Sequence, residues 1–108
     1  RTRLEENALL LRQAMEGLGF PVLGRPSGIV PVVLGGDAAA RHLTAAVLDS
    51  GGIVNLVEYP AVARNACRWR LQVMADHTPD DCLEFAQLVR QARLRLADPR
   101  NTLNEKEA

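Results

Sequence analysis

Apolar positions near the start of the chain recur at steps of three and four residues. They are Leu4, Ala8, Leu11, Met15 and Leu18. This spacing places them on one face of an α-helix, whereas Glu6 and Arg12 fall mostly on the other faces. Gly17 and Gly19 end the periodic pattern, and a proline follows them. The pattern predicts an amphipathic helix over residues 4–18.

Residues 29–34 read Ile-Val-Pro-Val-Val-Leu, a β-branched apolar run that is too short for a typical helix. Such a run predicts a strand. Pro31 has no N–H to donate to a neighbouring strand, which favours an edge position or a bulge. The preceding residues 20–28 contain two prolines and two glycines, so they are expected to form a loop. A fourth strand from residues 20–24 is left open.

A second helix is predicted over residues 38–49, with Asp37 as its N-cap. Its inner face would consist of Ala39, Leu43, Ala46, Val47 and Ser50. Two glycines stop this helix, and the β-branched residues 53–57 predict a second strand. Residues 59–66 are expected to form a loop.

Residues 68–73 alternate strictly between polar and apolar side chains, which is typical of a strand with one buried face. Trp69, Leu71 and Val73 would face the core. The opposite face would carry Arg68, Arg70 and Gln72. The two arginines would lie about 6 to 7 Å apart because each strand residue rises about 3.3 Å.

Thr78, Pro79 and Asp81 form the strongest local signal in the chain, because they match an N-cap, a first helical residue and a capping box. They predict a third helix that ends at Asp98–Pro99. Its inner face would consist of Cys82, Phe85, Ala86, Val89, Ala92 and Leu96. Residues 98–108 are polar and aperiodic, and are expected to be a disordered tail.

The predicted order is therefore α-β-α-β-β-α, in one α+β domain over residues 1–97. The sheet would have three strands, antiparallel or mixed, with the helices packed on one face. The other face would be left for solvent or for a partner.

Composition narrows the choice of partners. Thirteen Lys and Arg residues balance thirteen Asp and Glu residues, which argues against nucleic acid as a partner. No stretch reaches the roughly 18 apolar residues of a membrane span. Only two cysteines are present, Cys67 and Cys82, too few for a disulfide framework. We therefore expect a cytoplasmic protein that binds neither nucleic acid nor membrane.

Arg68 and Arg70 are the main candidates for chemistry, because paired guanidinium groups can hold a carboxylate or phosphate in two parallel hydrogen bonds. The alternative is two solvated arginines on an exposed sheet face. His42 and His77 have no partner at a metal-ligand or catalytic spacing, so a structural role and no metal site are expected. The cysteines are expected to be buried packing residues.

Several segments in order along the chain carry a family resemblance. They are Ser27–Gly35, Gly52–Asn55, Pro60–Val62, Ala66–Leu71 and Ala75–Thr78. From about residue 4 to residue 95 the chain resembles the C-terminal small domain of the α-oxoamine synthases. These are fold type I pyridoxal-phosphate (PLP) enzymes, such as 8-amino-7-oxononanoate synthase, that condense an amino acid with an acyl thioester.

The resemblance implies roles for particular residues. The family's Arg-x-Arg strand matches Arg68-Trp69-Arg70, which assigns Arg70 to the substrate carboxylate and leaves Arg68 as a supporting residue. Tyr59 and Pro60 would shape the channel for the acyl thioester. The family commonly has Pro-Pro-Thr-Val-Pro in that loop, from which Tyr59 through Ala63 depart.

The resemblance also implies what this chain lacks. The lysine that bonds PLP belongs to the family's large domain, and the one lysine here, Lys106, lies in the polar tail. The chain alone is therefore expected to be inactive, with no catalytic or cofactor-binding residue of its own. Its expected partners are the large PLP domain of the same polypeptide and a second copy in a homodimer. Arg1 in place of an initiator Met fits a segment of a longer protein. A free-standing small-molecule-binding or regulatory dimerisation module is the alternative.

Overall fold

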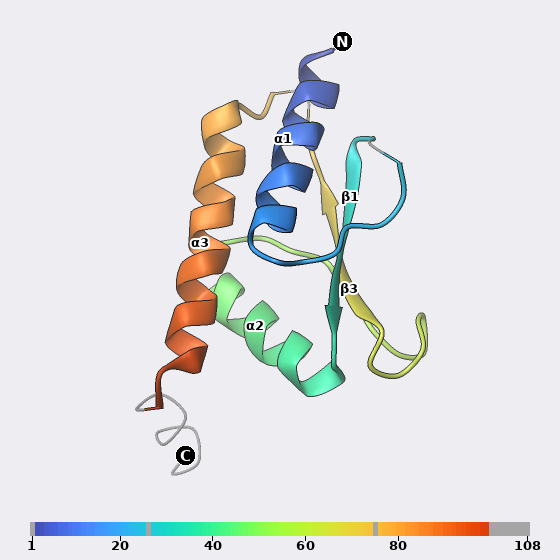
Figure 1. The fold of residues 1–108 in the computed structure, drawn as a ribbon, viewed down its shortest axis with the longest axis vertical. Helices are drawn as coiled ribbons and strands as arrows, with labels where there is room; N and C mark the ends of the chain where they lie inside the picture. Colours follow the sequence, from blue (N-terminus) through green and yellow to red (C-terminus); the bar gives the residue numbers. More distant parts are fainter. Residues whose placement is uncertain (1, 26, 75, 100–108) are drawn as a thin grey trace.

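Three helices lie on one side of a small sheet in the computed structural model, which describes residues 2–25, 27–74 and 76–99 (Figure 1). The elements in order are α1 (Arg3–Gly17), β1 (Ile29–Gly35), α2 (Asp37–Asp49), β2 (Leu56–Val57), β3 (Cys67–Gln72) and α3 (Pro79–Ala97). The α+β class and the order α-β-α-β-β-α are confirmed. The expected tail begins with Asp98 and Pro99, whereas residues 100–108 lie outside the described residues.

The sheet is antiparallel throughout, with strand order β1-β3-β2. Pro31 lies on the edge strand β1, as predicted. Its carbonyl accepts a hydrogen bond from Leu23 N at 2.9 Å, on the side away from β3. Because a residue's N–H and C=O point to the same side of an antiparallel strand, the missing N–H removes no bond to β3. Residues 21–23 contribute only an isolated bridge, Val22 to Val32, rather than a fourth strand.

The prediction of a strand over residues 53–57 is wrong in its first half, because β2 contains only Leu56 and Val57. Ile53 is 90% exposed. Gly52 packs so closely on α2 that an added Cβ would lie 2.7 Å from Val47 Cγ1. This contact holds the start of the segment against α2 and away from β3. Pairing with β3 begins at Asn55, whose carbonyl accepts a hydrogen bond from Arg70 N at 2.9 Å.

The predicted start of the second helix is also wrong. Asp37 is the first residue of α2. The N-cap is Gly36, a residue without a side chain that could cap the helix. The inner face is shifted near the start, where Ala40 and Thr44 are buried while Ala39 is exposed; Ser50 at the far end is exposed too. Leu43 and Val47 are buried as predicted. The Asp37 carboxylate bonds a distant loop instead of its own helix.

Helix α1 buries its predicted face, but it also buries a residue assigned to the polar side. Arg12 is only 7% exposed. Its guanidinium donates to the carbonyls of Leu23, Gly24 and Arg25 at 2.9 to 3.3 Å. These bonds hold the loop before β1 against the helix, so Arg12 satisfies backbone oxygens that would otherwise lack partners.

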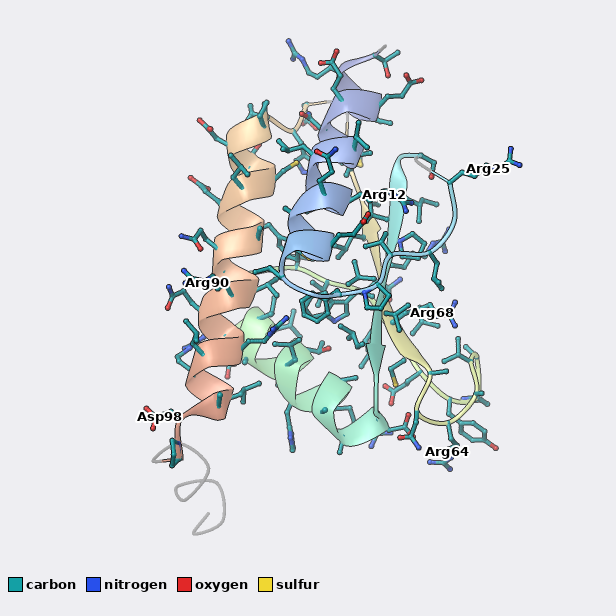
Figure 2. All side chains as sticks on the ribbon, in the orientation of Figure 1. Arg12, Arg25, Arg64, Arg68, Arg90 and Asp98 are labelled. Carbon is teal, nitrogen blue, oxygen red and sulfur yellow. The ribbon has the colours of Figure 1, made fainter. Side chains whose placement is uncertain are left out.

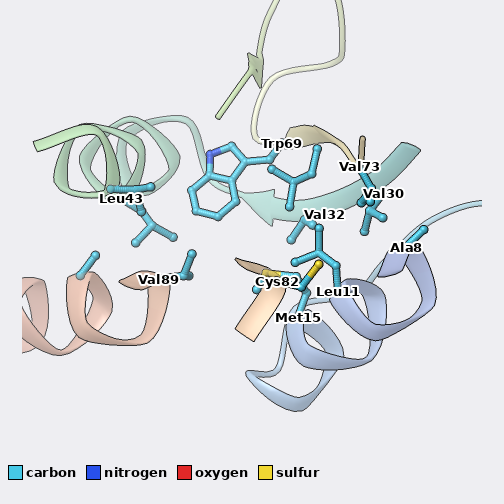
Figure 3. Packing of buried hydrophobic residues seen from close by; sticks show 13 residues of the cluster. Ala8, Leu11, Met15, Val30, Val32, Leu43, Trp69, Val73, Cys82 and Val89 are labelled. Atoms are coloured by element: carbon cyan, nitrogen blue, oxygen red, sulfur yellow. The ribbon is translucent and has the colours of Figure 1, made fainter. Parts of the chain in front are cut away.

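The core lies between the sheet and the helices, with Trp69 at its centre (Figure 3). The indole has no solvent exposure, and its ring centroid lies 6.3 Å from that of Phe20 and 6.2 Å from that of Phe85. Trp69 Nε1 donates to Thr44 Oγ1 at 2.9 Å, and that hydroxyl donates to Ala40 O at 2.7 Å. Every polar atom of this contact is paired, so β3 and α2 are joined by both packing and hydrogen bonds.

Helix α3 begins with the predicted capping box. Thr78 N donates to Asp81 Oδ2 at 2.8 Å, and Asp81 N donates to Thr78 Oγ1 at 3.1 Å. Two arginines near its end contact the residues that follow α1 and α2. Arg93 donates to Leu18 O and stacks on Phe20, while Arg95 donates to Ser50 Oγ. Their role is therefore more specific than complementing the helix dipole.

Because of the capping box, the stability of the fold depends on pH in the acidic range. The backbone hydrogen bond from Thr78 lowers the pKa of the Asp81 carboxyl below its ordinary value of 3.8. A carboxyl whose pKa is depressed by folding stabilises the protein above its unfolded pKa, and this contribution is lost as pH falls through the lower folded value. We expect Asp81→Asn to lower the melting temperature at neutral pH and to weaken its decline below pH 3.8.

Thermal unfolding followed by circular dichroism across the acidic range measures both effects. Asp80→Asn is the matched control, because the structure shows no hydrogen bond or ion pair for Asp80 within the described residues. An identical pH dependence in the wild type and in Asp81→Asn would contradict the prediction.

Candidate functional site

Arg70 extends from the middle of β3, on the face of the sheet opposite to Trp69. Its side chain is exposed. Its N–H donates to Asn55 O at 2.9 Å, and it lies opposite Pro31 of β1 in the register of the sheet. A pocket of about 720 Å³ opens beside it, between β3, residues 51–55 and the first turns of α3. This volume is in the range of small-molecule sites. Arg70 is among the residues that line this pocket, although its side chain projects from the uncovered face of β3 and the helices lie on the other face.

The pocket has a mixed lining. Its polar side chains are Asn55, Arg70, Gln72, His77, Asp81 and Glu84. The apolar wall includes Leu11, Val54, Leu71, Val73, Phe85 and Leu88. A guanidinium such as that of Arg70 can orient a small organic anion, whereas Asp81 and Glu84 bring two carboxylates to the same lining.

His77 lies in the turn that joins β3 to α3. Its Nδ1 accepts a hydrogen bond from Met74 N at 2.9 Å, which requires the neutral imidazole with its proton on Nε2. Asn7, which is 2% exposed, donates from its side chain to His77 O at 2.6 Å. The expected structural role of His77 is therefore seen, and the ring also lines the pocket. Neither the pocket contact nor Asn7 was identified from the sequence, because α1 and this turn meet only in the fold.

Arg68 lies apart from the pocket, although it shares a sheet face with Arg70. It is half-buried opposite Val33 and Val57 in the register of the sheet. Figure 2 shows its side chain pointing away from the helices. Its Nε has no hydrogen-bond partner within the described residues. The structure thus separates the two arginines, and only Arg70 lines the pocket.

Tyr59 and Pro60 lie in loop 58–66, near the opposite end of β3 from the pocket. Tyr59 is 50% exposed, and the Arg64 guanidinium stacks 4.2 Å from its ring centroid. Neither Tyr59 nor Pro60 lines the pocket beside Arg70. Any channel shaped by this loop would therefore be separate from that pocket.

Loop 58–66 is joined to the first turn of α2 by a reciprocal pair of hydrogen bonds. Asp37 N donates to Asn65 Oδ1 at 3.1 Å, and Asn65 N donates to Asp37 Oδ1 at 2.8 Å. Cys67 Sγ donates to the same carboxylate oxygen at 3.2 Å. The backbone bond from Asn65 is the main cause of the lowered pKa of Asp37. Burial, followed by the Asp37 contact, raises the pKa of the Cys67 thiol.

The remaining candidates are the two cysteines and His42. Cys67 and Cys82 are both free and buried, as expected. His42 is exposed on α2. Within residues 2–25, 27–74 and 76–99, no three His, Cys, Asp or Glu side chains are grouped so that they could hold a metal ion. No helix in this part of the chain is long and apolar enough to cross a membrane.

Comparison with known proteins decides the family. Residues 1–89 match the family described as Aminotransferase class I and II. The chain belongs to this family. Within it, the relatives are α-oxoamine synthases. The chain is 29% identical over 96 residues to 8-amino-7-oxononanoate synthase of Citrifermentans bemidjiense, and 39% identical over 79 residues to 5-aminolevulinate synthase 2 of Cereibacter sphaeroides.

These matches cover 89% and 72% of this chain, but only 25% and 19% of the two relatives. The chain thus spans about a quarter or less of their length. The fold agrees with the sequence match. A serine palmitoyltransferase from S. paucimobilis with bound PLP superposes with a TM-score of 0.75 at 29% identity, over 83% of this chain and 23% of that one.

The described residues of this family member do not by themselves form a PLP site. They include no lysine, since the one lysine of the sequence is Lys106, outside the described residues. A covalent link to PLP would therefore need a lysine outside the described residues. What this part of the fold offers is an exposed arginine on β3 and a pocket.

Proposed function

We propose that this chain is the C-terminal small domain of a PLP-dependent α-oxoamine synthase, such as an 8-amino-7-oxononanoate synthase, and that Arg70 binds the carboxylate of the amino-acid substrate. The observation that carries the proposal is the exposed Arg70 side chain on the uncovered face of β3, at a residue that also lines a ligand-sized pocket. Family membership and the share of the relatives that this chain spans support it.

Arg70 is suited to this role by its backbone as well as by its charge. A guanidinium fork matches the two oxygens of a carboxylate, and the hydrogen bonds of β3 to both sides fix the backbone from which the fork extends. Fixing the carboxylate orients the α-carbon of the substrate. Orientation of this kind lowers the entropic part of the barrier. Arg68, half-buried on the same face, is assigned a supporting role.

The rest of the site would come from the larger parent. PLP, when bound there, supplies an electron sink for the substrate's α-carbon. In this proposal the large domain holds PLP, Tyr59 and Pro60 shape the path of the acyl thioester, and two copies of the parent form a homodimer. The isolated chain is then inactive. Its two free, buried thiols are in keeping with a cytoplasmic location.

The mass of the native gene product, measured together with its visible absorption spectrum, tests the proposal directly. A product much heavier than 11.8 kDa that carries the absorption band of bound PLP is the expected result. A colourless product near 11.8 kDa would overturn the enzyme assignment.

A second candidate function is a free-standing module that binds a small molecule or dimerises. The observation in its favour is that the described residues of this chain already form a ligand-sized pocket at Arg70. Such a module would bind amino acids without PLP. Titration of the chain with amino acids, followed by chemical shifts of the Arg70 and His77 signals, separates the two. Saturable shifts would favour the module, and their absence would favour the enzyme domain.

A further inference from the structure

The first turns of α2 hold both ends of loop 58–66. At one end Arg41 Nε donates to Glu58 Oε1 at 2.8 Å. At the other end Asp37 and Asn65 exchange two hydrogen bonds between side chain and backbone. Asp37 and Arg41 are four residues apart and so share one face of the helix. We call these four residues the α2 clamp.

Asp37 makes the larger contribution to this clamp. Its Oδ1 accepts from the Asn65 backbone and from Cys67 Sγ, while its Oδ2 lies 3.8 Å from Arg64 Nη1. Arg64 in turn stacks on Tyr59. One carboxylate therefore contacts the base of the loop and, through Arg64, the aromatic residue expected at the thioester channel.

The geometry at Asn65 shows why a carboxylate is needed there. Asn65 has a φ of +59°, in the left-handed region that non-glycine residues seldom adopt. One bond with Asp37 satisfies the Asn65 N–H in that conformation, and the other joins the Asn65 side-chain oxygen to the Asp37 N–H. The exposed ion pairs, Asp37 with Arg64 and Arg41 with Glu58, contribute little to the stability of the loop by themselves, because solvent screens them. The backbone and thiol hydrogen bonds are the specific part of the contact.

A capping role would be the simpler explanation for an acidic residue at a helix start. The structure argues against it, because among the described residues the Asp37 carboxylate contacts Arg64, Asn65 and Cys67 and accepts no hydrogen bond from an N–H of α2. The negative charge does suit the helix N-terminus electrostatically. The carboxylate's hydrogen bonds, however, all go to residues 65 and 67.

We infer that Asp37 is a positioning residue that holds loop 58–66 in one conformation and thereby sets the affinity for the acyl thioester, a substrate that it does not itself touch. The inference rests on the proposed function for the thioester. It does not involve Arg70 or the amino-acid pocket. The loop and the pocket should therefore respond separately to substitution.

Amide hydrogen exchange in the protein tests the structural half. We expect Asp37→Ala to speed exchange at the Asn65 amide by about tenfold or more, because a backbone hydrogen bond to a charged group is lost. Asp37→Asn, which keeps an oxygen acceptor, should restore part of the protection. Asp49→Ala is the control, since Asp49 lies at the other end of α2 and makes no hydrogen bond or ion pair among the described residues. Unchanged exchange in Asp37→Ala would overturn the inference, whatever the parent catalyses.

Steady-state kinetics of the full-length enzyme test the functional half. We expect Asp37→Ala to raise KM for the acyl thioester about tenfold while KM for the amino acid stays within twofold. An equal rise in both KM values, or a lower kcat alone, would overturn the inference. If the wild-type enzyme turned over no thioester at all, the proposed function would fail instead, and the exchange result would still report on the clamp.

Discussion

Trp69→Ala is expected to reduce the free energy of unfolding by about 3 to 5 kcal/mol, as for other large-to-small changes of buried aromatic residues. The substitution removes a fully buried indole that lies between Phe20 and Phe85. It also removes the hydrogen bond to Thr44. Since domains of this size are stable by only about 5 to 15 kcal/mol, much of the folded population would be lost at moderate temperature. Urea unfolding followed by circular dichroism measures the change.

Two further variants separate packing from hydrogen bonding at this position. Thr44→Val keeps the volume but leaves the indole N–H without its acceptor, which should cost about 1 to 3 kcal/mol. Leu94→Ala is the control, because Leu94 is 55% exposed on α3 and its loss should change stability by less than about 0.5 kcal/mol. A cost below about 1 kcal/mol for Trp69→Ala would contradict the central place of the indole in the core.

The elements that could be predicted from the sequence are those whose signals are local. The capping box at Thr78 needs only three neighbouring residues, and the alternation in β3 needs only the strand itself. Both were predicted correctly, and with them the inward direction of Trp69 and the outward direction of Arg70. The family resemblance was confirmed as well.

The errors arose where contacts distant in sequence decide the structure. Asp37 is an acceptable N-cap by local rules, yet its carboxylate bonds Asn65, which is 28 residues away. Arg12 has a polar side chain on an amphipathic helix, but three carbonyls of the following loop bury it. Ile53 fits a β-branched run, and only the packing of Gly52 on α2 keeps it out of the sheet.

The candidate site was likewise predictable only where its signals are local. Arg70 follows from strand alternation, and the resemblance assigns it a carboxylate. The pocket beside it brings together four segments of the chain, including Asn55 and His77, which no spacing rule connects. The separation of Arg68 from Arg70 likewise became visible only in the fold.

Arg70→Ala in the full-length enzyme is expected to lower kcat/KM for the amino acid about 100-fold, through a higher KM and a lower kcat. Loss of a charge-assisted, two-point contact weakens binding, and the freed carboxylate no longer orients the α-carbon. Arg70→Lys should recover only part of the loss, because an ammonium carries the charge without the planar fork. Initial rates at varied amino-acid concentration, with saturating thioester, measure the effect.

The controls determine whether that loss belongs to Arg70 rather than to arginine in general. Arg90→Ala removes an exposed arginine from α3, on the far side of the helix layer from the sheet (Figure 2), and should leave kcat/KM within about threefold. Arg68→Ala should have an intermediate effect, since Arg68 shares the sheet face but does not line the pocket. Equal losses of kcat/KM in Arg68→Ala and Arg70→Ala would contradict the assignment of Arg70 to the carboxylate and of Arg68 to a supporting role. Unchanged kinetics in a folded Arg70→Ala enzyme would remove Arg70 from the site, because no other arginine lines this pocket among the described residues.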